Sequence, residues 1–352
     1  MGVGNQDETA FSFEGNWREY APIAFTNLFF TIITLGIYRF WATTRTRQYL
    51  WSNTRFIDEK LTWTGTGKEL FIGFLIALVL LIAPLFILQF GLQALILQGY
   101  TAVAAILGLL AYVFIFCLLG FARFRALRYR LTRTYWHGIR GGSDNPGYAY
   151  SWSYFWKTIV GAFAFGLMIP WSMTNLWNER WNRMSFGPHM FEAGADYSNI
   201  FGRFLLFYLA PIGLIIAGSV FAMGALSSGN LDSVAATGFL FALLLYAIIG
   251  LCALGFYAAY FREAISKLSL STIDFEFTAR AADWFKFVLI TVALVIGTLG
   301  IGLIFVQYRT WVFFITHLEA GGEINLADLT QSETAVGTHG EGLLDAFDVG
   351  AI

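Results

Sequence analysis

Long apolar runs alternate with short polar and basic segments along most of this chain. Charged residues occur only at the ends of the runs, so the charges mark their boundaries. A run of about 20 apolar residues is long enough for a helix to cross the hydrocarbon core of a membrane. The uncharged intervals are Tyr20–Tyr38, Leu70–Ala122, Thr158–Trp177, Phe204–Leu231, Ser233–Phe261 and Phe287–Tyr308. The pattern predicts a helical membrane protein that crosses the bilayer several times.

Two features of the pattern set the number of helices. The second interval is too long for one helix, and the Gln98-Gly99 break divides it into a hairpin of about 70–95 and 100–122. The fourth and fifth intervals form another hairpin around the turn Ser227–Asn230. We therefore expect an all-α polytopic fold with about seven transmembrane helices.

Composition supports this class of protein and excludes others. Of the 352 residues 57% are hydrophobic and only 13% are charged, whereas about 25% of residues are charged in soluble domains. The net charge of -1 indicates neither acidic nor basic partners. Cys117 and Cys252 lie in separate apolar runs and predict no disulfide framework. The polar, acidic first ten residues do not resemble a cleavable signal peptide, so we expect the first apolar segment to direct insertion.

The opening stretch is repeated later in the chain. Adding 264 to its numbering carries Phe11-Ser12-Phe13 onto Phe275-Glu276-Phe277. The same shift carries Thr34-Leu35-Gly36-Ile37 onto Thr298-Leu299-Gly300-Ile301, without a gap. A weaker middle copy begins at Tyr148-Ala149-Tyr150 and has Pro170-Trp171 in place of Gly-Ile. We therefore expect three imperfect copies, at about 11–122, 148–261 and 275–320.

Each copy is predicted to contain an aromatic alternation, an apolar helix, a break and a basic, aromatic segment. The alternations have the period of short strands, and a further one lies at Leu61-Thr62-Trp63. The breaks at Gly36, Pro170 and Gly300 are candidate hinges. Residues 1–330 are expected to form one membrane domain. The acidic segment 331–352, which contains no Lys or Arg, is expected to be a disordered tail.

The first copy also carries a resemblance to a known family. Residues 11–56, FSFEGNWREYAPIAFTNLFFTIITLGIYRFWATTRTRQYLWSNTRF, resemble the YjgN-like bacterial inner-membrane proteins, also called domain of unknown function 898. The matching features are the initial FxFxG, Asn27, the TLGIYRFW motif, Arg45, Tyr49, Asn53-Thr54 and the closing segment Leu61–Gly65. The resemblance extends over about residues 11–320. It implies a polytopic protein of the bacterial inner membrane and no particular activity.

The charges leave two topologies open. In the first, seven helices cross, and the basic segments Arg39–Lys68 and Arg123–Lys157 face the cytoplasm under the positive-inside rule. Two copies would then run in opposite directions, as in many secondary transporters. In the second, the helix that heads each copy dips into the membrane and returns at its break. Every basic segment would then be cytoplasmic. We expect the seven-crossing arrangement because a re-entrant backbone needs shielding from lipid.

The basic, aromatic segments provide the candidate binding residues. Clusters of Arg at the cytoplasmic edge of a membrane helix attract anionic headgroups, and Arg binds phosphate through two parallel hydrogen bonds. We predict that anionic phospholipid is the partner at the cytoplasmic face. Since these segments are tied to the membrane surface, nucleic acid is not an expected partner. The candidate headgroup-binding residues are Arg45, Arg47, Arg123, Arg125 and Arg128.

Catalytic and metal-binding signatures are not found in the sequence. No pair of histidines has the spacing of a metal site, and no phosphate-binding loop or nucleophile motif occurs. We therefore expect neither an enzyme nor a cofactor. The repeats favour transport or translocation of a small or amphiphilic molecule. The alternative is a non-transporting membrane protein that binds anionic lipid headgroups, or a partner, through its arginine-rich face.

Overall fold

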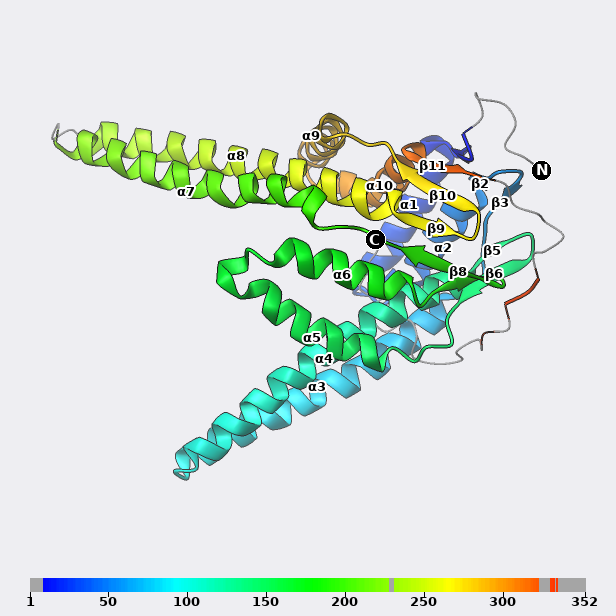
Figure 1. The fold of residues 1–352 in the computed structure, drawn as a ribbon, viewed down its shortest axis with the longest axis horizontal. Coiled ribbons are helices and arrows are strands. Elements are labelled where there is room, and N and C mark those ends of the chain that lie inside the picture. Colours follow the sequence, from blue (N-terminus) through cyan, green and yellow to red (C-terminus); the bar gives the residue numbers. More distant parts are fainter. Residues whose placement is uncertain (1–8, 228–230, 323–329, 333, 335–352) are drawn as a thin grey trace.

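The computed structural model describes residues 9–227, 231–322, 330–332 and 334 (Figure 1). The α-helices are α1 (Trp17–Ile33), α2 (Arg39–Ser52), α3 (Gly67–Leu97), α4 (Thr101–Arg133), α5 (Tyr148–Ala162), α6 (Ile169–Trp181), α7 (Ser198–Ser227), α8 (Leu231–Ser266), α9 (Ala281–Gly297) and α10 (Val306–Thr316). The strands are β1 (Phe11–Phe13), β2 (Thr54–Phe56), β3 (Glu59–Lys60), β4 (Thr62–Trp63), β5 (Thr134–Trp136), β6 (Ile139–Gly142), β7 (Ser185–Phe186), β8 (His189–Ala193), β9 (Leu268–Leu270), β10 (Ile273–Phe277) and β11 (Leu318–Gly321).

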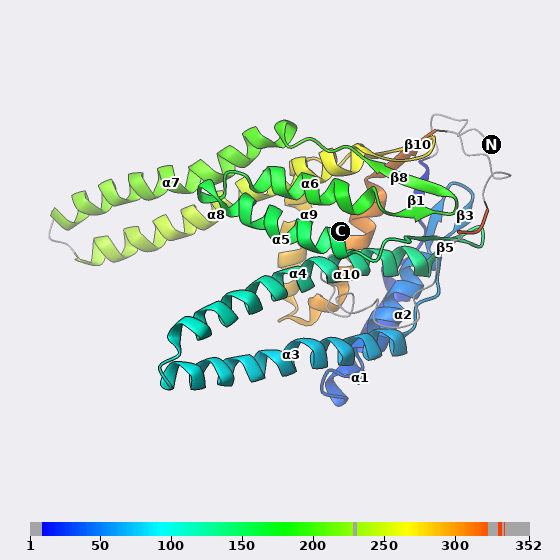
Figure 2. The ribbon, with the colours of Figure 1, turned by 60° about the horizontal axis from the view of Figure 1, so that its bottom comes forward.

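Four helices in the described part of the chain are long and apolar enough to cross a membrane. They cover Gly67–Leu97, Thr101–Arg133, Ser198–Gly224 and Gly238–Ser266. The helices α3 and α4 lie side by side, as do α7 and α8, and both pairs extend away from the strands (Figures 1 and 2). Most side chains in these spans are exposed. Their apolar surfaces are therefore available to lipid.

Local capping signals define where the long pairs begin. Thr66 and Glu69 form a reciprocal capping box at the start of α3, with two hydrogen bonds of 3.3 Å. Asp196 precedes α7 and accepts hydrogen bonds from the Ser198 amide (3.0 Å) and hydroxyl (2.8 Å). These bonds hold the pKa of Asp196 below its usual range. Each helix follows a strand after a short loop, and Figure 1 shows that both extend to the same side of the strands.

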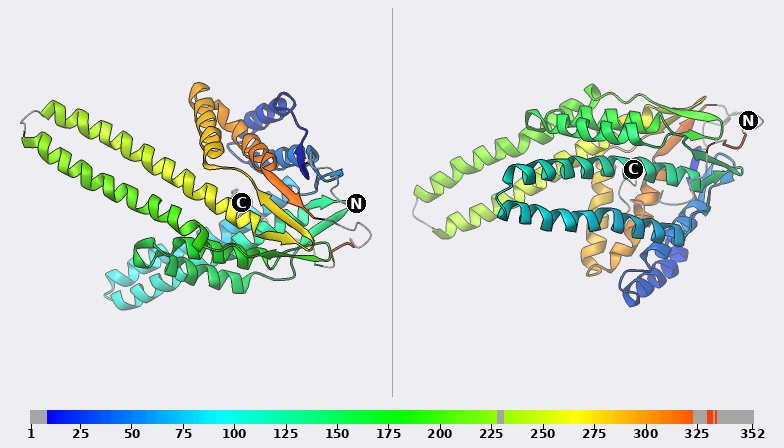
Figure 3. Two further views of the ribbon diagram at one scale, coloured as in Figure 1. Left: turned by 45° about the horizontal axis from the view of Figure 1, so that its top comes forward. Right: turned by 90° about the horizontal axis from the view of Figure 1, so that it is seen from below.

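Three short helical hairpins accompany the long pairs. They are α1–α2, α5–α6 and α9–α10; the second contains a 3₁₀ turn, η1 (Ala164–Gly166), and the third another, η2 (Ile301–Phe305). One polar contact in each hairpin joins its two arms: Asn27 to the Ala42 carbonyl (3.2 Å), Lys157 to Glu179 (2.8 Å) and Arg309 to Thr291 (3.2 Å). The first and third hairpins pack beside each other (Figure 3). Thus α1, α5 and α9 each end in a reversal of the chain.

The three reversals share one backbone conformation. An apolar residue and a following glycine both have positive φ in each hairpin, a conformation that glycine adopts readily and other residues rarely. The pairs are Leu35 (50°) with Gly36 (91°), Phe165 (57°) with Gly166 (88°), and Leu299 (51°) with Gly300 (93°). Two of the expected breaks, Gly36 and Gly300, lie at these reversals. Pro170 lies in the first turn of α6, after the middle reversal.

The strands form an antiparallel sheet on which the helices are arranged. Eight strands follow the order β11-β10-β9-β8-β7-β6-β5-β4, and β1, β2 and β3 form a second sheet. Three strand pairs have the partners Phe11↔Phe56, Gly141↔Phe186 and Phe275↔Ala320. Adding 130 to both numbers of the first pair gives the second, and adding 264 gives the third. The same shifts relate Leu35 to Phe165 and Leu299. The strand pairs and the chain reversals are therefore separated by the same number of residues in all three regions.

The structure changes four expectations. The expected strand Tyr148–Tyr150 forms the first turn of α5, and the strand of this region is β6 (Ile139–Gly142), which lies before it in the chain. The seven-crossing count is not confirmed, because only the four long helices meet the length and hydropathy of a span among the described residues. Since α3 and α7 leave the sheet in the same direction, the long pairs are not inverted. An eight-stranded sheet also accompanies the helices where only isolated short strands were expected.

The packed core lies between the short hairpins, the bases of the long pairs and the sheet. Phe124 from α4, Trp177 from α6 and Phe256 from α8 belong to its largest apolar cluster. A second cluster joins the first and last hairpins, where Trp51 and Trp311 stack with ring centroids 4.0 Å apart. Aromatic burial thus connects segments that are distant in sequence, and this fixes the hairpins relative to the sheet.

Part of the C-terminal segment returns to the sheet. The Gln331 amide donates a 2.9 Å hydrogen bond to the Gly138 carbonyl, and the Arg140 guanidinium contacts the Ser332 carbonyl at 3.4 Å. The remainder of the predicted disordered tail, apart from Thr334, lies outside the described residues. The predicted turn at Ser227–Asn230 also falls largely outside them, at 228–230.

Candidate functional site at the junction of helices and sheet

Charged side chains gather where the long helices meet the sheet. At the base of the first long pair, Arg133 binds Glu69 through two hydrogen bonds, Nη2 to Oε1 at 2.9 Å and Nε to Oε2 at 3.2 Å. The Tyr129 hydroxyl donates to the same carboxylate at 3.1 Å. A two-point arginine–carboxylate pair is geometrically specific. It ties the beginning of α3 to the end of α4.

The base of the second long pair has equivalent sequence positions but different chemistry and a different hydrogen-bond pattern. Asn199 and Glu263 stand 130 residues after Glu69 and Arg133. The Asn199 amide donates to Glu263 Oε1 at 3.0 Å, and the Asp196 amide donates to the same oxygen at 3.0 Å. An acidic residue therefore replaces the arginine at the end of α8. The two junctions differ in charge although their backbones match.

Two predicted headgroup residues lie on α2. The Arg45 guanidinium donates to the Tyr38 hydroxyl at 3.1 Å and remains exposed. Arg47 is only 3% exposed, and its guanidinium lies 5.1 Å from the centre of the Trp63 ring. Burial makes Arg47 part of the packed base of the hairpin, whereas Arg45 can face a membrane surface.

The other three predicted residues lie together on α4. Arg123 lies over the Tyr154 ring at 5.1 Å, and Arg125 lies over the Phe121 ring at 4.6 Å. Arg128 donates to the Asn145 carbonyl at 3.0 Å. Their contacts are mainly with the same helix and with α5. The structure therefore groups Arg123 with the middle hairpin and places Arg45 and Arg47 on another helix.

The middle hairpin carries charged residues that were not selected from the sequence. Glu179 on α6 pairs with Lys157 on α5 (2.8 Å) and with Arg183 (2.8 Å). Arg180, in the last turn of α6, is 7% exposed and lies 5.6 Å from the centre of the Trp177 ring. In the sequence, the only indication of this residue was an arginine among the tryptophans of the segment that forms α6. Arg180 becomes notable only when the middle hairpin is aligned with the first by a shift of 130 residues, and that alignment is defined by the strand register.

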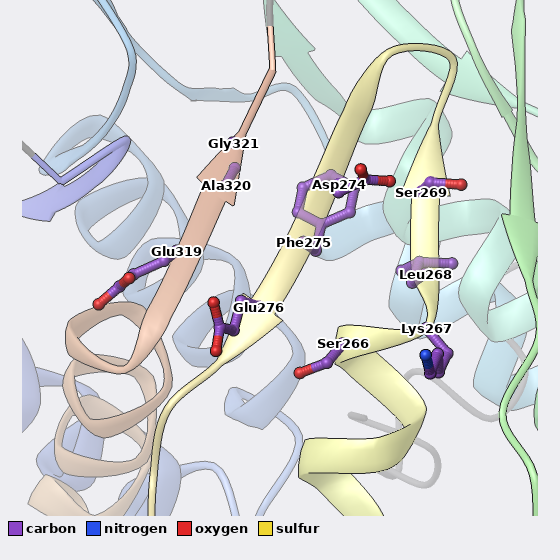
Figure 4. A pocket seen from close by; sticks show the side chains of 10 residues that line it. All are labelled: Ser266, Lys267, Leu268, Ser269, Asp274, Phe275, Glu276, Glu319, Ala320 and Gly321. Carbon is purple, nitrogen blue, oxygen red and sulfur yellow. The ribbon is translucent and has the colours of Figure 1, made fainter.

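An open hollow of about 730 Å³ lies on the outer strands β9, β10 and β11 (Figure 4). Glu276 and Glu319 face each other across β10 and β11 and project from the same side of the strands. Asp274 and Lys267 also line the hollow. Its acidic character does not match an anionic headgroup. In the described residues no group of three His, Cys, Asp or Glu side chains is placed to hold a metal ion.

The four long apolar helices and the charged residues at their sheet ends define a helical, multi-pass membrane protein. The chain belongs to the family described as "Bacterial protein of unknown function (DUF898)", which it matches over residues 8–346. The resemblance predicted from the first copy is therefore confirmed.

Curated relatives match part of the chain. A protein of Salmonella typhimurium strain LT2 named "Inner membrane protein YjgN" is 26% identical over 130 residues, or 37% of this chain and 30% of that protein. The protein of the same name from Escherichia coli K12 is 26% identical over 157 residues, or 45% of this chain and 36% of that protein. The chain thus matches about a third of the length of these relatives. No solved structure matches. Together with the long apolar helices, the relatives place this protein in the bacterial inner membrane.

Proposed function

We propose that this protein binds lipids of one membrane leaflet without transporting a substrate. It is built from three copies of one unit. Two long pairs cross the membrane, and three short hairpins enter it from the sheet side and turn back. The observation that carries this proposal is the exposure of three equivalent apical side chains: Leu35 (93%), Phe165 (90%) and Leu299 (94%). Large apolar tips at the ends of three hairpins are suited to contact with acyl chains.

The backbone at the apices fits an apolar environment. Hydrocarbon offers no hydrogen-bond partners, so polar groups of the chain must be satisfied internally. The Thr34 hydroxyl accepts a hydrogen bond from the Tyr38 amide at 2.9 Å, and the Thr298 hydroxyl accepts one from the Gly302 amide at 2.6 Å. Each hydroxyl also donates to the carbonyl four residues earlier. This supports a role for the threonine of the Thr-Leu-Gly motif in closing the apex.

The charge beside the first apex supports shallow insertion. Arg39 begins α2 only three residues after Gly36, and its side chain is exposed. A charge at the centre of a bilayer costs at least about 2.5 kcal/mol. A long arginine side chain avoids this cost by extending its guanidinium to the headgroups. The apex at Leu35 would then lie within one leaflet, close enough to the surface for Arg39 to reach it.

The distribution of basic residues supports a cytoplasmic position for the sheet. Both sequences that join the helices of a long pair, at 98–100 and 228–230, contain no Lys or Arg. The sheet ends of the same helices carry many of them, and the positive-inside rule assigns that side to the cytoplasm. Anionic headgroups there would be attracted by about 1 kcal/mol for each basic residue near the surface. Arg45 and Arg123 remain the strongest of the predicted headgroup contacts.

Transport is the weaker proposal. Its support from the sequence was an inverted arrangement of the copies, as found in secondary transporters. That argument requires three crossings in each copy, whereas α3 and α7 leave the sheet in the same direction. The charged residues of the four spans also lie near their sheet ends or at the start of α8.

Depth and side-specific labelling test the proposal on the full-length protein. Cys117 and Cys252 are first replaced by Ser. Single cysteines are then placed at Leu35, Phe165 and Leu299 and labelled with a fluorophore in nanodiscs that carry quenchers at defined depths. We expect quenching to be strongest for quenchers in the sheet-side leaflet at all three positions.

A second set of single cysteines reports topology in intact cells and inverted vesicles. The sites Lys60, Met190 and Glu319 are exposed and lie on β3, β8 and β11. All three should react only from the cytoplasmic side. Labelling of one site from each side of the membrane, or quenching of an apex from the opposite leaflet, would show that a hairpin crosses and would contradict the proposal.

A further inference from the structure

The middle copy buries an arginine where the first copy has a buried leucine and the third a partly buried phenylalanine. Shifting Arg180 by 130 residues toward the N-terminus gives Leu50, which is 1% exposed, and shifting it by 134 toward the C-terminus gives Phe314. Within the described chain Arg180 makes no hydrogen bond or ion pair, and its Nε is buried without a partner. Its position in the last turn of α6 gives only partial compensation from the helix dipole. An unpaired buried charge costs several kcal/mol.

Neighbouring donors on α6 are also unsatisfied. The indole nitrogens of Trp177 and Trp181 are buried and lack a hydrogen-bond partner among the described residues. The two rings lie 5.7 Å apart, and Trp177 also lies against the Arg180 guanidinium. An indole N–H and a guanidinium can donate hydrogen bonds but cannot accept them. A molecule that satisfies this group must therefore supply acceptors.

The other copies provide an internal comparison. Trp51, which stands 130 residues before Trp181, donates to the Thr134 hydroxyl at 2.8 Å. The residue equivalent to Thr134 in the next copy is Ala264, which has no side-chain acceptor. Trp311, which stands 134 residues after Trp177, donates to a hydroxyl at 2.8 Å. The middle copy therefore combines an indole found in the first copy with one found in the third, and Trp181 lacks the hydroxyl acceptor that Trp51 has.

A second arginine completes the cluster. Arg123 of α4 lies over the Tyr154 ring, which lies 6.4 Å from the Tyr150 ring, and the Tyr260 ring lies 6.3 Å from that of Trp177. Tyr260 comes from α8, so four helices contribute to the cluster. Arg123 makes no hydrogen bond or ion pair within the described residues. Two positive charges and several hydroxyl or indole donors thus converge without an acid bound to either arginine.

The local acid is already engaged. Glu179 precedes Arg180 in the sequence, but its two oxygens pair with Lys157 and Arg183. The close packing of α5 on α4 also fixes the site, since a Cβ at Gly120 would lie 2.6 Å from the Tyr154 Cβ. The cluster therefore combines positive charge with hydrogen-bond donors and is held by rigid elements.

We infer that Arg180 and Arg123, with the Trp177 indole and the Tyr150 and Tyr260 hydroxyls, bind a phosphate group. Arginine binds phosphate through a planar pair of donors, and tyrosine and tryptophan add neutral ones. The phosphate belongs either to an anionic phospholipid or to a small soluble phosphate. The first source rests on the proposed lipid-binding function, and the second does not.

The test uses the full-length protein in nanodiscs. Arg180→Leu introduces the residue that the first copy has at this position, so the variant is designed to fold. Arg180→Lys keeps the charge and removes the planar donor pair. Arg55→Gln is the matched control, because Arg55 is an exposed arginine 3.9 Å from Glu14 and distant in sequence from the cluster. Native mass spectrometry measures retained phosphatidylglycerol against phosphatidylcholine, and thermal shift measures the response to inorganic phosphate.

We expect Arg180→Leu to weaken binding of the phosphate-bearing probe about tenfold or more, as loss of hydrogen bonds to a charged group implies. The affinity of Arg180→Lys for the probe should lie between those of Arg180→Leu and the wild type, and the affinity of Arg55→Gln should match that of the wild type. In phosphatidylcholine without ligand, Arg180→Leu should melt at the same temperature as the wild type or higher.

The arms separate the possible failures. Loss of phosphatidylglycerol with Arg180→Leu assigns the phosphate to lipid, and loss of the inorganic phosphate response alone assigns it to a soluble compound. If the wild type retains phosphatidylglycerol, Arg180→Leu retains it equally and the response to inorganic phosphate is also unchanged, the site is wrong although the lipid-binding function stands. Equal behaviour of the variant and the wild type in both arms overturns the site. A fall in melting temperature without ligand, with unchanged binding, overturns it as well, since Arg180 would then serve only the fold.

Discussion

The first and middle short hairpins follow the same backbone path but bury different chemistry. In the first, Leu50 and the hydrogen-bonded Trp51 fill the base of the hairpin. In the middle one, Arg180 and Trp181 occupy these places, and the partner of the indole is missing. The comparison teaches that the sheet and the reversals preserve a framework within which single positions are free to change. A ligand site is therefore to be sought where a side chain differs between equivalent positions, as at Leu50 and Arg180, rather than where the side chains are the same.

The largest expected effect comes from transferring the middle chemistry into the first copy. Leu50→Arg should destabilise the protein by roughly 3–5 kcal/mol, because the first copy offers no buried anion for the new charge. Thermal unfolding in detergent, followed by size-exclusion chromatography, measures the loss. Leu50→Met is the control and should cost less than about 1.5 kcal/mol. A stable Leu50→Arg protein would mean that the first hairpin accepts a buried cation as the middle one does. The proposed difference between the two hairpins would then be wrong.

Packing of the middle hairpin on the first long pair should be nearly as sensitive. Gly120→Ala places a methyl group 2.6 Å from the Tyr154 Cβ, so α4 and α5 must separate. We expect a loss of about 1–3 kcal/mol, measured as a shift in thermal unfolding. Gly91→Ala on α3 is the matched control, since no atom lies within 4 Å of a Cβ there. Equal stability of the two variants would show that α5 does not pack closely on α4.

An exchange of charges tests whether the two long-pair junctions are equivalent. Asn199→Glu alone places a carboxylate beside Glu263 and should destabilise the base of the second pair. Adding Glu263→Arg reproduces the Glu69–Arg133 pair of the first junction. A double-mutant cycle of unfolding free energies should give a favourable coupling of about 0.5–3 kcal/mol. A coupling near zero would contradict the structural equivalence of the two junctions.

The smallest expected effect concerns the start of the second long pair. The pKa of Asp196 is lowered by its hydrogen bonds to Ser198. Its contribution to stability is therefore present above the ordinary pKa of an aspartate and is lost as the pH falls through the lower folded value. Asp196→Asn should reduce the acid sensitivity of unfolding below about pH 4. Glu192→Gln, on the exposed face of β8, is the control. An unchanged pH profile in Asp196→Asn would assign this acid sensitivity to other carboxylates.

Much of the architecture was predictable because it depends on local pattern. The first long pair was located from hydropathy and charge, and the Thr-Leu-Gly motif marked the first and third reversals. The middle reversal was placed at Pro170 because proline is the stronger breaker in sequence. The chain instead turns at Phe165-Gly166, where an apolar residue adopts a positive φ that composition does not reveal.

The candidate site was less predictable because it depends on contacts between distant segments. The arginines of α4 were found from their clustering after an apolar run. Arg180 was not, since its meaning comes from burial and from comparison with Leu50. Tyr260 reaches the same cluster from α8, 80 residues after Arg180 in the chain. The sheet registers supply the alignment that reveals these equivalences, and strands of two to five residues carry too little pattern to define register.

The contact between the first and last hairpins also sets an order for synthesis. The Trp311 indole donates to the Thr54 hydroxyl at 2.8 Å across 257 residues of chain. A ribosome adding about 5–20 residues per second needs on the order of ten to fifty seconds to produce that interval. During this time the first copy enters the membrane with its aromatic face uncovered. Its partner is the last hairpin to emerge, so closure of the molecule follows insertion of both long pairs.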